Sequence, residues 1–145
     1  ALEEFGLCLG YAYQIIDDLL DFMSDRTKLG KPCGSDLREG NITLPVIYLL
    51  RDLSYGPWLQ TVIAERAFDA ANITAITEAL IKNGAIDACL QLTYNFITRG
   101  LERLDKLPAG PARKEIMDMG KFLLENYYRS LRTDIITVER EMSSS

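Results

Sequence analysis

The amino-acid sequence predicts an all-α protein. Apolar residues recur at the three- and four-residue spacing of amphipathic helices, and most glycines and prolines fall between such runs. No segment shows the alternation of apolar and polar residues that is typical of a half-buried strand. With 145 residues, of which 48% are hydrophobic, the chain suits one globular unit or part of a larger one.

The first predicted helix spans residues 2–27. A loop is expected over residues 26–41, because three glycines and a proline lie within these sixteen positions. Helix is expected to resume at Leu44, since Thr43 suits the N-cap and Pro45 suits the first turn.

Two shorter helices are predicted in the middle of the chain. The first spans residues 58–68 and follows the helix-breaking Gly-Pro pair at 56–57. The second begins at an N-cap, either Asn72 or Thr74, and ends at Gly84, whose position suits the C′ residue of a helix.

Two longer helices are expected to complete the fold. They span residues 86–107 and 113–133, with a proline-containing turn at 108–111, and the serines at 143–145 are expected to be frayed. The large apolar residues of these helices have the spacing of a buried stripe, so they are expected to pack in the core. They are Leu101, Leu104, Ile116, Phe122, Leu123 and Tyr127.

Five acceptor side chains lie on one face of the first helix. At about 100° per residue, they share roughly one third of the helix surface, with an apolar face opposite. Like charges four residues apart repel by about 0.2–0.5 kcal/mol per pair, and no Lys or Arg occurs between residues 1 and 25. The stripe therefore requires positive charge from outside the helix. Its members are Gln14, Asp17, Asp18, Asp21 and Asp25, and the apolar face has Leu9, Ala12, Ile16, Leu19, Leu20 and Met23.

A solvated acidic face is the alternative interpretation of this stripe. Aspartate is a weaker helix former than glutamate, so a face that served only solubility would more naturally contain Glu and Lys. The large apolar residues beside the acids also suit the wall of a cavity better than an open surface. We therefore expect the acids to bind a cation.

Composition excludes several kinds of chemistry. The chain has no histidine, which removes Ser-His and Cys-His catalysis and His-ligated zinc or iron. Metal ligands would then be carboxylate oxygens, and these hard ligands select magnesium, calcium or manganese. Magnesium (Mg²⁺) is the expected ion, because a few carboxylates usually hold it together with substrate phosphates.

Charge and hydropathy limit the partners. A net charge of −5 without a basic cluster argues against nucleic acid or an anionic membrane surface as the main partner. The longest apolar run, residues 45–50, is too short for a transmembrane segment. The cysteines are odd in number and widely spaced, which indicates reduced thiols, so we expect a soluble, cytoplasmic protein. They are Cys8, Cys33 and Cys89.

The loop after the first helix carries the first cations of the chain, Lys28, Lys31 and Arg38. Together, the acidic stripe and this Gly-rich loop could hold a polyphosphate: the carboxylates would bind magnesium ions and the cations would bind phosphate oxygens. Its glycines would let the backbone approach an anion, although glycines in such positions also simply form turns.

Two segments carry a family resemblance. The sequences GYAYQIIDDLLDF at residues 10–22 and LGKPCGSDLREGNITLPVI at residues 29–47 closely resemble the second aspartate-rich region of trans-isoprenyl diphosphate synthases, also called polyprenyl synthetases. A looser similarity, which includes residues 83–86 and 107–110, continues to about residue 132.

The resemblance implies an isoprenoid-synthase-type helical bundle, in which two aspartate-rich helices face each other across a cavity. Residues 1–145 would then be the C-terminal part of a single polyprenyl synthetase domain whose N-terminal half is absent. Family members ionise an allylic diphosphate with Mg²⁺ and condense it head to tail with isopentenyl diphosphate. We expect these 145 residues alone to be inactive.

The resemblance also implies metal ligands. Asp17 resembles the main magnesium ligand of the motif, and Asp18 and Asp21 resemble residues that bind the ion directly or through water. Asp36 matches the loop carboxylate that orders metal-bound water. Asp25 lies outside the core of the motif.

Three residues resemble groups that contact the substrate. Gln14 is similar to the polar residue beside the reacting allylic end, and Lys31 to the lysine that clamps the diphosphate. The family usually has lysine where this chain has Asn41, which weakens phosphate affinity or shifts phosphate binding to Arg38. Tyr13 replaces a common phenylalanine, which is a mild change.

Two other functions are compatible with these motifs. The chain could come from a non-catalytic partner subunit of a prenyl synthase, for which Asn41 is the only hint, or from a terpene cyclase of the same fold. The Gly-Lys-Pro sequence at residues 30–32 favours chain elongation. From the family we also expect a homodimer and a peripheral membrane contact for product release.

Overall fold

The computed structural model describes residues 1–23 and 33–144, and all regular structure in these ranges is helical. The all-α prediction is confirmed. The elements are α1 (Leu2–Met23), α3 (Ser35–Glu39), α4 (Leu44–Leu50), α5 (Gly56–Ala64), α6 (Ala70–Lys82), α7 (Ala85–Leu104), α8 (Pro111–Leu123), the π-helical segment η1 (Leu124–Tyr128) and α9 (Arg129–Ser143).

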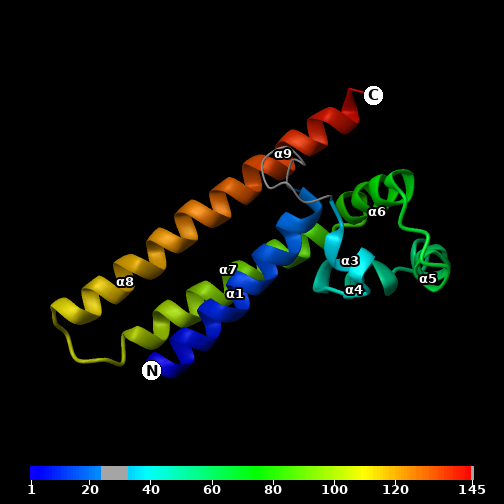
Figure 1. The fold of residues 1–145 in the computed structure, drawn as a ribbon. Coiled ribbons are helices and arrows are strands. Elements are labelled where there is room, and N and C mark those ends of the chain that lie inside the picture. Colours follow the sequence, from blue (N-terminus) through cyan, green and yellow to red (C-terminus); the bar gives the residue numbers. More distant parts are fainter. Residues whose placement is uncertain (24–32, 145) are drawn as a thin grey trace.

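Helices α1 and α7 form the centre of the fold and lie side by side over most of their length (Figure 1). Gly100 of α7 permits this close approach: a Cβ atom there would lie 3.0 Å from Cβ of Cys8 and 3.4 Å from the ring of Phe5. Phe5 and Cys8 are themselves buried. The α1 face that packs on α7 is therefore a continuous apolar surface.

Helices α3 to α6 gather at one end of this pair, where α1 ends and α7 begins (Figure 1). Their apolar side chains extend the core of the central pair into a small helical cluster. Fully buried members of the cluster are Leu37, Val46, Leu49, Leu59, Ile73, Ile76 and Leu80. This end of the molecule holds the α3 segment against α1.

Helices α8 and α9 and the η1 segment between them form one long rod that runs along the central pair (Figure 1). Helix α9 packs on α1 through the buried Leu131 and Ile135. In α8, by contrast, Gly120 is the only buried residue. The α8 part of the rod is therefore loosely packed.

The prediction of core residues was correct at Leu104, which is fully buried. Leu101, Ile116 and Leu123 are only partly buried. For Phe122 and Tyr127 the prediction was wrong, because their exposed fractions are 64% and 43%. Helical spacing predicts an apolar stripe, but the stripe of α8 has few neighbours in the described part of the chain.

The observed helix ends show which of the predicted capping residues are correct. Gly84 has φ +84° and follows α6, as predicted. The N-cap of α6 is Asp69, not Asn72 or Thr74, since the Asp69 carboxylate accepts a hydrogen bond from the Asn72 N–H at 2.8 Å. Thr43 and Pro45 begin α4 as predicted, but the Thr43 side chain forms no cap hydrogen bond.

Other boundaries differ from the predictions. The expected loop at residues 26–41 contains the short helix α3, which begins after Gly34 in the left-handed conformation. Helix α5 begins two residues before the predicted start, at Gly56, and the last helix continues to Ser143 instead of ending at 133. The predicted end of the first helix, at 27, lies outside the described residues.

Candidate functional site

The C-terminal end of α1 is joined to α3 through Asp21. The two carboxylate oxygens of Asp21 accept hydrogen bonds from the backbone N–H groups of Ser35 and Asp36, each at 3.2 Å. The Asp21 carbonyl accepts a further bond from the Gly34 N–H at 3.0 Å. Asp21 therefore satisfies N–H groups that begin α3, which would otherwise lack partners.

Asp18 lies on the α4 side of the same helix and is 8% exposed. Its carboxylate accepts a hydrogen bond from Nε2 of Gln14 at 2.9 Å and one from the Leu44 N–H. Burial raises the pKa of Asp18, and the negative charges of Asp36 and Asp17 add to this effect. The two hydrogen bonds oppose the rise by favouring the ionised form.

The pKa of Asp21 is also raised, and by a larger amount. Burial raises its pKa to about 6, and the negative charges of Asp36 and Asp17 act in the same direction. The N–H groups of Asp36 and Ser35 lower it in part. A divalent cation beside these carboxylates would favour their ionised forms, because opposite charge lowers a carboxyl pKa.

The structure brings the four predicted metal ligands into one region. Asp17 is exposed, Asp18 is buried, and Asp21 and Asp36 are intermediate. Within the described ranges, however, no group of three or more His, Cys, Asp or Glu side chains is close enough to hold a metal ion.

Of the three predicted phosphate-binding cations, only Arg38 lies within the described residues. Lys31 and Lys28, like Asp25, lie outside the described residues. Nε of Arg38 donates to the Cys33 carbonyl at 3.4 Å, so this guanidinium lies beside the segment that leads into α3. Asn41, which stands where the family usually has lysine, is exposed.

Sequence reasoning missed Arg66, which contacts α3 from the far end of α5. Its Nη2 donates to the carbonyl oxygen of Arg38 at 3.3 Å. Nothing in the sequence indicated this contact, because the two residues lie 28 positions apart and no glycine marks the end of α5.

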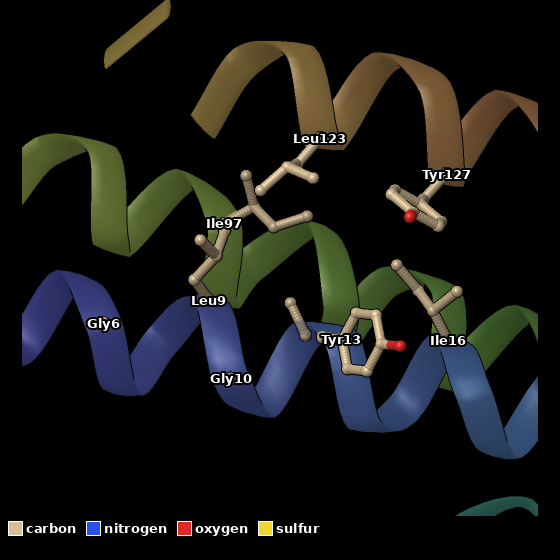
Figure 2. A pocket seen from close by; sticks show the side chains of 9 residues that line it. Gly6, Leu9, Gly10, Tyr13, Ile16, Ile97, Leu123 and Tyr127 are labelled. Atoms are coloured by element: carbon tan, nitrogen blue, oxygen red, sulfur yellow. The ribbon is translucent and has the colours of Figure 1, made fainter. Parts of the chain in front are cut away.

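An apolar groove of about 250 Å³ lies next to the acidic site, between α1, α7 and the α8–η1 part of the rod. Figure 2 shows the side chains that line it, and the rings of Tyr13 and Tyr127 lie edge to face with centroids 6.3 Å apart. Along α1 it extends from Gly6 to Ile16, the residue that precedes Asp17. The lining residues are Gly6, Leu9, Gly10, Ala12, Tyr13, Ile16, Ile97, Leu123 and Tyr127.

Comparison with known proteins identifies the family. Residues 1–80, more than half of the chain, match the family described as polyprenyl synthetase. This chain belongs to the polyprenyl synthetase family. The resemblance read from the two sequence segments is thus confirmed, and the chain is homologous to prenyltransferases.

Individual relatives agree with this assignment. The chain is 37% identical to component 2 of the heptaprenyl diphosphate synthase of Bacillus subtilis, over 85% of this chain and 35% of that protein. Its fold matches a decaprenyl diphosphate synthase from Rhodobacter capsulatus with a TM-score of 0.70 and 27% identity, over 85% and 37% of the two chains.

A polyprenyl synthase from Caulobacter crescentus, solved with calcium and isoprenyl diphosphate, matches with a TM-score of 0.69 and 30% identity, over 82% and 37%. The chain thus spans little more than a third of the length of these relatives. In the described ranges, none of the helices combines the length and apolar character needed to cross a bilayer.

Proposed function

We propose that the intact protein is a Mg²⁺-dependent trans-polyprenyl diphosphate synthase. It would ionise an allylic diphosphate and condense the allylic group head to tail with isopentenyl diphosphate. The observation that carries this proposal is the placement of four carboxylates, Asp17, Asp18, Asp21 and Asp36, around the contact between α1 and α3. A homologue of the same fold has been solved with both a divalent cation and an isoprenyl diphosphate.

These residues fit Mg²⁺. The site offers oxygen ligands, which this ion prefers. Burial raises the pKa values of Asp18 and Asp21, the negative charges of Asp36 and Asp17 add to this effect, and a cation would offset that negative charge. When bound, Mg²⁺ would supply positive charge to the diphosphate as its C–O bond breaks. The four carboxylates are the groups that would hold it.

Other residues of the site would position the carboxylates or bind the diphosphate. Gln14 holds the carboxylate of Asp18 by a direct hydrogen bond, in addition to the substrate contact that the family implies for it. Asp21 anchors α3, which carries Asp36 and Arg38. Arg38 and Lys31 would bind diphosphate oxygens, since guanidinium and ammonium groups form charge-assisted hydrogen bonds with phosphate.

We further propose that the enzyme is a cytoplasmic homodimer that contacts the membrane peripherally during product release. Cys8 and Cys89 are buried as free thiols, which suits a reducing compartment. Large apolar side chains of α1, among them Leu2, Leu7 and Tyr11, are exposed and available to further parts of an assembly.

Asp17→Ala in the intact protein tests the proposed function. The expected result is a fall in kcat/KM for the allylic diphosphate of about 10²- to 10³-fold, which is typical of losing one group that stabilises developing charge. Asp118→Ala, at an exposed acid of α8, is the matched control and should leave the rate unchanged. The measurement is steady-state elongation with isopentenyl diphosphate and Mg²⁺.

Other outcomes would favour the alternative functions. A non-catalytic partner subunit would respond to Asp17→Ala hardly at all, and a terpene cyclase would release a cyclic hydrocarbon instead of a longer diphosphate. Elongation by the isolated 145-residue chain would contradict the expectation that the remaining part of the enzyme is required.

A further inference from the structure

Arg66 has an unusual backbone conformation. Among the described residues it is the only non-glycine residue with positive φ, at 50°. The Ala67 N–H bonds the Val62 carbonyl at 3.0 Å and the Arg66 N–H bonds the Ile63 carbonyl at 3.1 Å, which is the Schellman pattern at a helix C-terminus. Glycine is the residue that this position favours, so the arginine is placed against backbone preference.

The side chain of Arg66 reaches the opposite end of the α3 segment. Its Nη2 donates to the Arg38 carbonyl, which lies in the last turn of α3. Carbonyls in the last turn of a helix lack intrahelical partners. The Arg66 guanidinium therefore caps the C-terminal end of α3.

Helix α3 is thus held at both ends by side chains from other helices. Asp21 binds the N–H groups at its start, and Arg66 binds a carbonyl at its end. Five residues cannot form a stable helix by themselves, so these two contacts and the buried side chain of Leu37 place it. Asp36 and Arg38 lie between the two anchors.

We propose that Arg66 is a positioning residue for the diphosphate site. It holds α3 so that Asp36 stays beside Asp18 and Asp21 and Arg38 stays on the same short helix, an inference that rests on the proposed function. Arg66 itself contacts backbone and acts on the substrate only through α3.

Arg66→Gly in the intact protein separates positioning from a purely structural role. Glycine suits the left-handed C′ position, so the variant should unfold at the same or a higher temperature than the wild type. We expect kcat/KM for the allylic diphosphate to fall about tenfold through a higher KM, since displacement of binding groups by about 1 Å can reduce rates by up to about 10²-fold. Arg66→Lys keeps a hydrogen-bond donor, so its kcat/KM should fall less than that of Arg66→Gly.

Calorimetry with Mg²⁺ and inorganic pyrophosphate gives a readout that does not depend on turnover. Arg66→Gly should bind this probe about tenfold more weakly than the wild type, the change expected from the same displacement of α3. Arg51→Ala, which removes an exposed arginine at the end of α4, should bind it equally well.

Two results would overturn the inference. The first is that Arg66→Gly binds pyrophosphate and has a KM as in the wild type. The second is that it loses affinity and kcat/KM together with a matching fall in unfolding temperature. If the wild-type enzyme itself forms no prenyl product, the proposed function fails, and the pyrophosphate measurement still decides the role of Arg66.

Discussion

The two halves of α1 differ in how the rest of the chain contacts them. Helix α1 contacts α3, α4, α7 and α9. In its C-terminal half, from Gln14 to Met23, Asp21 accepts hydrogen bonds from the start of α3 and Asp18 accepts one from Leu44 at the start of α4. The N-terminal half packs well on α7 but exposes Leu2, Leu7 and Tyr11 elsewhere. The acidic end is thus organised by contacts within these 145 residues, whereas the apolar end leaves large side chains uncovered.

Matched leucine substitutions test this difference most strongly. Leu19 is fully buried and Leu7 is 53% exposed. Leu19→Ala should lower the free energy of unfolding of the chain by about 3 kcal/mol, because it leaves a cavity. Leu7→Ala should change it by less than about 0.5 kcal/mol. Urea unfolding of the two variants measures both values, and equal effects would show that the halves do not differ.

A glycine substitution tests the packed side of the N-terminal half. In Gly100→Ala the new methyl group would lie 3.0 Å from Cβ of Cys8, which is too close for an unshifted neighbour. We expect a loss of about 1–3 kcal/mol in the free energy of unfolding, as is usual for overpacking. Gly110→Ala is the control, since no atom lies within 4 Å of a Cβ at that position. Similar values for the two variants would argue against a tight α1–α7 contact.

The pH dependence of stability tests the acidic half. The folded chain holds a proton on Asp21 up to about pH 6, whereas the ordinary pKa is 3.8. Between these values the folded state binds more protons than the unfolded state, so stability should fall as pH rises from about 4 to about 6 and then level off. Asp21→Asn should flatten this profile in urea titrations, and a wild-type-like slope in the variant would contradict the assignment.

Local signals in the sequence were sufficient for part of this structure. These signals depend on neighbouring residues, and they correctly predicted the helix that carries Asp17, Asp18 and Asp21, the start of α4 at Thr43 and Pro45, and the end of α6 at Gly84. The acids were placed on one helix face, yet Asp18 is buried against α4 while Asp17 is exposed. A helical wheel gives directions around an axis but does not show which neighbour covers each direction.

Long-range contacts were not predictable in this way. The exposure of Phe122 in α8 and of Tyr127 in η1 depends on which other helices pack on the rod, which no spacing within the rod encodes. Arg66 reaches α3 by a hydrogen bond across 28 positions of the chain, and no glycine marks the end of α5. Both cases were decided by tertiary packing, which overrides local preference.

The η1 segment changes the direction in which the side chains of the C-terminal rod point around its axis. A π-type turn accommodates about one residue more than an α-turn, so the phase of the helix changes by roughly 100° as the chain passes from α8 to α9. A single wheel drawn through residues 111–143 would therefore misplace one of its two parts. Leu131 and Ile135 are the buried residues of α9, so a wheel that describes their face has to start after η1, at residue 129.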